Sequence, residues 1–339
     1  MIELSRHIVR TLLGIKWALL ALALLLAFNA IFTDNFFEIR FQDGHLYGTL
    51  IDILNHGSKV AIVAVGMTLV IATAGVDLSV GAIVAISGAV AASLLVERGA
   101  PWYVAIVAAL VTSLALGLWN GALVVWLRLQ PIVATLILMV AGRGVAQLIT
   151  DGRIITFEDS HLAWFGNGAL FALPVPVTML ALVAGVGALL TRRTALGMFI
   201  ESVGDNEQAS RLAGVPDRAV KLFVYTFCGL CAGIAGIIEC SYIKAADANN
   251  AGQLLELDAI LAVVIGGTSL MGGRFFILGS IVGALLMQAL TKTLYMLDVS
   301  ADIAPAPKAI AVVLVCLLQS PAGRELIARW RSRRRGGSA

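Results

Sequence analysis

A few ionisable and amide side chains lie inside long apolar stretches, where they are the groups best able to act on a solute. Burying an ionised side chain at the centre of a membrane helix costs about 2.5–3.5 kcal/mol, so such positions demand an explanation. The candidates for a translocation pathway or a broken helix are Asp77, Asn120, Arg143, Gln147 and Asp258. The two amides could hydrogen-bond a polyhydroxyl solute, and packing between helices explains them equally well.

Two of these residues carry more specific alternatives. Asp77 follows Gly75-Val76, where an apolar run is interrupted. It could cap a broken helix by accepting backbone N–H groups, or it could serve the pathway. Arg143 is deep in its apolar run, which favours a position facing protein or a wet cavity. No ladder of acidic residues runs through the apolar stretches, and this weakens a proton-coupled mechanism.

Sequence motifs of catalysis are missing. The chain contains neither a G-x-x-x-x-G-K-S/T phosphate loop nor an H-E-x-x-H pair, and its four histidines lie outside the apolar runs. Cys228-x-x-Cys231 has the spacing of a redox or metal pair, but no second pair or nearby histidine completes it. We therefore predict no catalytic residue, no metal and no cofactor.

Composition defines the elements that must position these side chains. Of 339 residues, 59% are hydrophobic and only 13% are charged, and the mean hydropathy is +0.93. Soluble domains carry roughly 25% charged residues, so this chain has too few to coat a globule. We predict an all-α integral membrane protein. The basic tail at residues 321–339 is typical of a cytoplasmic anchor after a membrane span, and no nucleic-acid partner is expected.

Apolar runs between charged or turn-rich breaks predict about ten membrane spans in one domain over residues 1–339. In chain order the runs cover residues 12–32, 60–74, 77–96, 102–127, 131–149, 174–190, 220–238, 257–271, 275–294 and 304–318. With the N-terminus inside, this count puts most lysines and arginines on one face, as the positive-inside rule requires. Both termini are therefore predicted to be cytoplasmic.

Glycines suggest close packing and a weak internal repeat. Gly117 with Gly121, and Gly229 with Gly233, have the spacing that lets membrane helices approach closely. Residues 75–81 and 267–273 share glycine and leucine positions, and each interrupts an apolar run. Interrupted segments in two halves are typical of transporters built from repeats.

The polar segment at residues 194–218 contains the sequence of a short helix. Asp205 or Asn206 can serve as its N-cap, Ala209–Ala213 as its body and Gly214 as its stop. Such a helix between spans could be a passive connector. Its mixture of small and polar residues would equally suit docking into the groove of a partner.

Several motifs together give the chain a family resemblance. The stretches are GMTLVI at 66–71, GVDLSVG at 75–81, ATL at 134–136, GDNEQA at 204–209, ELDAI at 256–260 and GGTSL at 266–270. From about residue 35 to 318 the chain resembles the permease subunits of bacterial ATP-binding-cassette sugar importers, the ribose and branched-chain permease family.

The resemblance implies a type II importer permease fold with pseudo-repeated halves, in the bacterial inner membrane. Its partners would be an ATPase subunit, a second permease and a periplasmic sugar-binding protein. The short cytoplasmic helix would couple to the ATPase through Gly204, Asn206, Ala209, Arg211 and Gly214. The chain departs from the usual family pattern at Asp205, Ser210 and Arg274, which would all lie on the cytoplasmic face.

We therefore expect a non-enzymatic permease subunit of an ATP-driven sugar importer. Within the family, residues 141–150 and 246–252 are most similar to a galactofuranose-type member, which favours that monosaccharide or a pentose. The alternative is an ion-coupled secondary transporter that works without an ATPase.

Overall fold

The computed structural model describes residues 2–33, 35–42, 45–300, 303, 305–310 and 313. The predicted basic tail at 321–339 and most of the predicted span at 304–318 lie outside these residues. The elements in chain order are α1 (Ile2–Phe32), β1 (Arg40–Gln42), β2 (His45–Tyr47), α2 (Thr49–Ala72), α3 (Val80–Val96), α4 (Trp102–Val125), α5 (Pro131–Ile149), β3 (Ile155–Thr156), α6 (Ser160–Asn167), β4 (Ala169–Leu170), β5 (Leu173–Pro174), α7 (Val175–Arg193), α8 (Leu196–Asp205), α9 (Glu207–Leu212), α10 (Asp217–Ile243), β6 (Ala245–Ala246), α11 (Leu255–Ile265) and α12 (Ile277–Met296).

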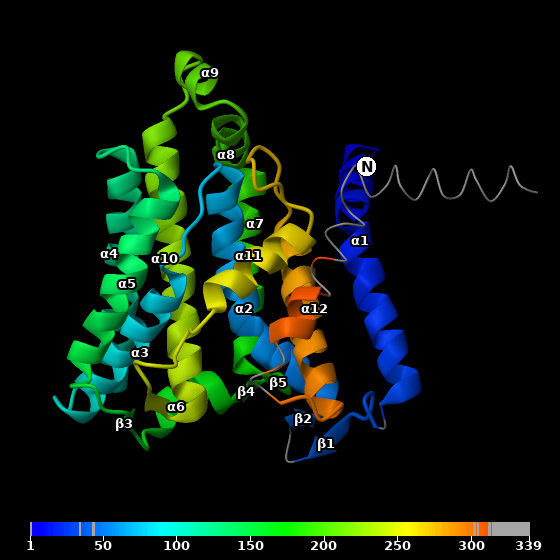
Figure 1. Cartoon of the computed structure of the whole chain (residues 1–339), viewed down its shortest axis with the longest axis vertical. Helices are drawn as coiled ribbons and strands as arrows, with labels where there is room; N and C mark the ends of the chain where they lie inside the picture. The colour runs from blue at the N-terminus through cyan, green and yellow to red at the C-terminus, as the bar shows by residue number, and fades with distance from the viewer. Residues whose placement is uncertain are drawn as a thin grey trace, which may run out of the picture.

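The long helices form a bundle with two distinct ends (Figure 1). At one end, here called the α9 end, α9 projects beyond the other helices, and α1 also begins at this end. At the other, the α6 end, lie α6 and three short antiparallel strand pairs, β1 with β2, β3 with β6 and β4 with β5. In the pair that joins distant parts of the chain, Ile155 lies opposite Ala246.

Within the described residues, seven helices are long and apolar enough to cross a membrane: α1, α2, α4, α5, α7, α10 and α12. The fold is therefore that of an all-α integral membrane protein, as the composition predicted. The 17-residue α3 and the 11-residue α11 are shorter. At 1.5 Å per residue α11 is about 16 Å long, roughly half of a bilayer core. The count of ten spans stays a prediction.

Two helices differ from the predicted runs at 60–74 and 257–271. The first begins at Thr49, because polar side chains near its start are paired: Lys292 Nζ lies 2.9 Å from Asp52, and Lys59 Nζ lies 3.6 Å from Glu239. The second ends at Ile265, because Gly267, Gly272 and Gly273 adopt positive φ angles that end the helix.

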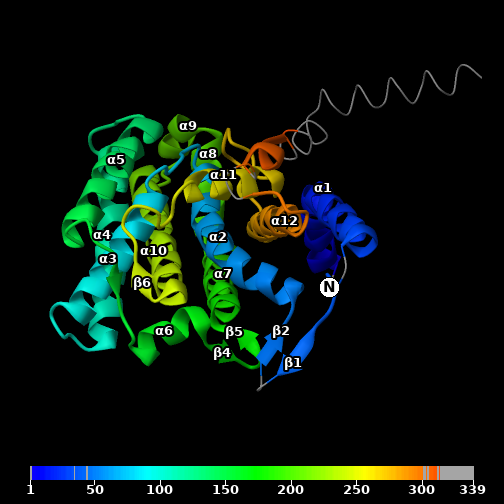
Figure 2. The same ribbon diagram turned by 60° about the horizontal axis from the view of Figure 1, so that its bottom comes forward.

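The core is centred on α2 and α10 (Figure 2). In the most apolar 18-residue stretch of each helix, 78% of the residues of α2 and 67% of those of α10 are buried inside the protein. The corresponding fraction is 28% or less for α1, α4, α5 and α7. These outer helices leave most of their apolar surface for lipid. In Figure 2, α2 lies between α10 and α12.

Glycines make the closest helix contacts. A Cβ atom on Gly229 of α10 would lie 2.8 Å from the Cα atom of Gly117 on α4, and 2.6 Å from the Ser113 carbonyl oxygen. A side chain at either glycine would therefore force the backbones apart. Two of the small-residue pairs found in the sequence thus meet each other at one helix crossing.

Candidate functional site

The projecting hairpin of α8 and α9 contains the residues that the resemblance implies for coupling. The Asn206 side chain caps α9, since its Oδ1 accepts a hydrogen bond of 2.9 Å from the Ala209 N–H. The helix ends at Leu212 with Ala213 as its C-cap, and Gly214 follows with a φ of 85°, which an L side chain rarely adopts. The predicted cap and stop of this helix are confirmed.

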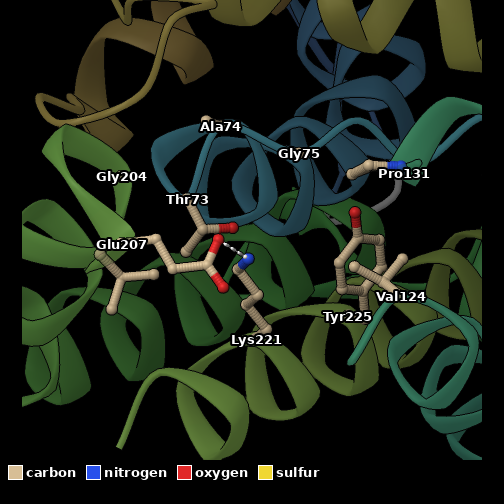
Figure 3. A pocket seen from close by; sticks show the side chains of 10 residues that line it. Thr73, Ala74, Gly75, Val124, Pro131, Gly204, Glu207, Lys221 and Tyr225 are labelled. Atoms are coloured by element: carbon tan, nitrogen blue, oxygen red, sulfur yellow. Dashed lines mark hydrogen bonds and ion pairs between the residues drawn. The ribbon is translucent and has the colours of Figure 1, made fainter. Parts of the chain in front are cut away.

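Ion pairs fasten α9 to the start of α10. The Arg211 guanidinium donates to both carboxylate oxygens of Asp217, at 3.2 and 2.6 Å. That hydrogen bonding raises the pKa of Arg211. On the same helix Glu207 accepts a 2.6 Å bond from Lys221, which Figure 3 shows as a dashed line. Arg211 therefore holds the short helix in place, and its side chain is not wholly free for a partner.

The outer surface of α9 has no cover within the described residues. Gln208, Ala209 and Ala213 are exposed, and the apolar side chain of Leu212 is 90% exposed. A six-residue helix is too short to be stable through its own hydrogen bonds, so its ion pairs and cap hold a small, partly apolar surface in a defined position.

At the base of this hairpin, Gly204 lies against two other breaks in the helical structure. A Cβ atom on Gly204 would meet the Ala72 carbonyl and lie 2.6 Å from the Gly273 backbone nitrogen. The Gly273 N–H donates to the Ala72 carbonyl at 3.0 Å. Thus α8 packs directly on the end of α2, three residues before the segment 75–81, and on the segment 267–273 between α11 and α12.

A cavity of about 270 Å³ lies between these elements (Figure 3). Its lining includes Gly75 beyond α2, Glu207 on α9, and Lys221 and Tyr225 on α10. In Figure 3 the Tyr225 hydroxyl points toward Gly75 and Pro131. The cavity therefore lies between the hairpin of α8 and α9 and the break between α2 and α3.

That break holds a fully buried polar cluster. Asp77 Oδ1 accepts hydrogen bonds from the Ser79 N–H at 2.9 Å and from the Ser79 hydroxyl at 2.6 Å. The Asn120 amide donates to Ser79 Oγ at 2.7 Å and to Asp77 Oδ1 at 3.3 Å. Asp77, Ser79 and Asn120 have no exposed surface. Asp77 thus accepts one backbone N–H, that of Ser79 directly before α3, and both alternatives for Asp77 stay predictions.

Arg143 and Gln147, one turn apart on α5, both contact the segment between β6 and α11. The Arg143 guanidinium donates to the carbonyls of Ala248 and Ala251, at 3.1 and 2.6 Å. The exposed Gln147 amide donates to Asn249 Oδ1 at 2.6 Å. This segment displays amide side chains, so the α5 face forms a small polar surface beside apolar helices.

Asp258 lies apart from both groups of polar side chains. Its carboxylate pairs with Lys308, at 3.0 Å. Lys292 and Lys308 both form ion pairs with acids on other helices. Sequence reasoning missed Ser79, Tyr225 and Lys221, because nothing in the local pattern of an apolar helix marks them. Within the described part of the chain, no group of three or more metal-ligating side chains occurs.

This arrangement, a bundle of spanning helices with a buried polar break and an exposed hairpin at one end, is that of a multi-span membrane protein. The chain matches the family model described as "Branched-chain amino acid transport system / permease component" over residues 49–328, and it belongs to that family.

Several relatives of this chain are named as permeases for sugars. It is 52% identical to the galactofuranose transporter permease protein YtfT of Escherichia coli K12, over 93% of this chain and 92% of the relative. It is 40% identical to the fructose import permease protein FruF of Bifidobacterium longum, over 95% of this chain and 92% of that relative. Identity to the ribose import permease protein RbsC of Escherichia coli K12 is 39%, over 93% and 96%. No solved structure matches the chain.

Proposed function

We propose that this chain is the membrane subunit of an ATP-driven sugar importer and that its solute is a galactofuranose-type monosaccharide. The observation that carries the proposal is the 52% identity to the galactofuranose permease over 93% of the chain. Relatives named for fructose and ribose support the broader class of sugars. Hydrolysis of ATP belongs to a separate subunit.

In this proposal the α9 end faces the cytoplasm of a bacterial cell with the inner membrane around the bundle. Both chain termini are then cytoplasmic. The ATPase subunit docks on the exposed surface of α9 at Ala209 and Leu212. A second permease, identical or homologous, completes the pathway, and a periplasmic sugar-binding protein delivers the solute to the α6 end.

Movement of the hairpin supplies the coupling. Because α8 packs through Gly204 on the end of α2 and on the segment before α12, displacement of α9 by the ATPase acts on both breaks. ATP shifts the chain between inward-open and outward-open states only through its different affinity for the two states of the complex. The capped break at Asp77 lies across the cavity from α9 and can respond to that shift.

The polar surface on α5 supplies weak contacts for the sugar. Replacing Gln147 with alanine removes an exposed amide that binds Asn249, and we expect uptake to fall about threefold to tenfold, since one hydrogen bond is worth about 1 kcal/mol. Radiolabelled sugar uptake at several concentrations measures the effect. Lys244→Ala on the same side of the bundle is the control. Unchanged uptake by Gln147→Ala would remove this residue from the pathway.

The proposed function itself is tested in liposomes. The chain is reconstituted with and without an ATPase subunit, a second permease and a sugar-binding protein, and uptake of galactofuranose, ribose and fructose is compared. We expect uptake only when ATP and all subunits are present. Sugar flux driven by an ion gradient, with no ATPase in the vesicle, would contradict the proposal and establish the secondary transporter.

A further inference from the structure

A second cavity, of about 420 Å³, opens between the α4–α5 connection and α9. Four basic side chains line it: Arg128 from the connection, Arg211 from α9, and Arg218 and Lys221 from α10. Two amides, Gln130 and Gln208, add hydrogen-bond donors. Side chains from three parts of the chain thus converge on one space.

The balance of charge in this cavity is positive. Its two acids are engaged, since Asp217 pairs with Arg211 at 2.6 Å and Glu207 pairs with Lys221 at 2.6 Å. Arg128 and Arg218, both exposed, form no ion pair with any residue that the structure describes. Two guanidinium groups therefore remain available, and guanidinium groups bind phosphate oxygens in bidentate geometry.

The Arg128 backbone is held in an uncommon conformation. Its φ of 52° lies in the left-handed region, which costs a non-glycine residue free energy. The tight connection that imposes this angle directs the chain from α4 into α5 over a few residues, and it brings Arg128 to the cavity.

Neighbouring residues place the cavity at the level of the bilayer surface. Trp126 and Leu127, which directly precede Arg128, are 66% and 63% exposed at the end of a spanning helix. Exposed tryptophan at a helix end is typical of the headgroup level of a membrane. The exposed apolar side chains of Trp126 and Leu127 thus lie next to the unpaired Arg128. A molecule with both an acyl chain and an anionic headgroup could contact all three.

We propose that this cavity binds the phosphate group of an anionic phospholipid, with Arg128 and Arg218 as its main ligands. Basic pockets between spanning helices are sites of this kind. The bound lipid would lie against α9 and so would link the bilayer to the coupling hairpin. The proposal goes beyond the transport function and depends neither on the sugar nor on the ATPase.

Lipid retention by the purified full chain tests this site. The chain is reconstituted in phosphatidylcholine or in a mixture of phosphatidylcholine and phosphatidylglycerol, and bound lipid is counted by native mass spectrometry after detergent exchange. We expect preferential retention of phosphatidylglycerol. The double variant Arg128→Gln/Arg218→Gln should lose about 30-fold in apparent affinity, since each of the two basic residues near a membrane surface contributes on the order of 1 kcal/mol. The variant must retain the melting temperature of the wild type in phosphatidylcholine.

The matched control is Arg192→Gln/Arg193→Gln, which removes two exposed arginines at the end of α7, outside the cavity. It should retain the lipid as the wild type does. Competition by glycerol 1-phosphate at equal phosphate concentration would identify a soluble phosphate ester as the ligand of the same two arginines, whereas no competition identifies the lipid.

Two outcomes would overturn the site: equal retention of phosphatidylglycerol and phosphatidylcholine by the wild type, or equal losses of lipid in both double variants. An acidic side chain of a partner protein would then be the better candidate for Arg128 and Arg218.

Discussion

Replacing Ala209 with arginine is expected to lower ATP-driven sugar uptake by at least about 100-fold. Ala209 is exposed on α9, and its neighbour Leu212 presents an apolar side chain with no cover in the described structure. A docked partner would bury this surface, and burying an unpaired charge in the middle of an interface costs several kcal/mol. The fold should survive, because an exposed helical position tolerates arginine within about 0.5 kcal/mol.

Three measurements together test whether Ala209 lies in the docking surface for the ATPase: uptake in vesicles, co-purification of the ATPase subunit, and the melting temperature of the chain alone. Ala209→Ser keeps the residue small and uncharged, so it should retain both uptake and the ATPase. If Ala209→Arg transports sugar and still holds the ATPase, the docking surface is elsewhere. A failure of this prediction leaves the lipid site at Arg128 and Arg218 untouched, since that site is measured without partners.

Replacing Asp77 with leucine is expected to lower the free energy of unfolding by about 2–4 kcal/mol, because each buried neutral donor that loses its acceptor costs about 1–3 kcal/mol. The substitution would leave the Ser79 N–H and hydroxyl without their acceptor, in a cluster with no exposed surface, whereas the Asn120 amide would keep its bond to Ser79 Oγ. Titration of the purified chain with denaturing detergent measures the change.

Asp77→Asn gives the informative comparison. Its amide oxygen can still accept from Ser79, so the loss should be nearer 1 kcal/mol, as for a single hydrogen bond. Ser79→Ala, which removes one hydroxyl and leaves the capped N–H in place, should cost a similar amount. Equal losses for leucine and asparagine would show that the charge of Asp77 matters more than its capping.

The positions of single elements show how far the sequence alone goes. The predicted span at 131–149 coincides with α5, because Pro131 fixes the start of the helix and a polar turn follows Ile149. Asn206 and Gly214 likewise mark the limits of α9, since capping is decided by residues within one turn. Both are local features, and local features can be read from a pattern.

The predicted runs at 60–74 and 257–271 fail for a different reason. Hydropathy treats Asp52 and Lys59 as breaks, but their partners Lys292 and Glu239 are far along the chain and neutralise them inside the bundle. The 257–271 run is apolar from Ala259 to Ile265, yet glycines with positive φ end the helix at Ile265. A hydropathy average over about 20 residues cannot reveal an ion pair whose partners are more than 150 residues apart in the sequence.

Sequence by itself determined that this chain is a membrane protein, where most of its long helices lie, and how its short exposed helix is capped. Those properties follow from hydration and from hydrogen bonds between near neighbours. Only the tertiary structure decided that Gly204 meets Ala72 and Gly273, that Asn120 joins Asp77, and that Arg128 and Arg218 share a cavity. Such contacts depend on which faces of distant helices pack together. The sequence of a uniformly apolar helix does not predict which neighbour each of its faces contacts.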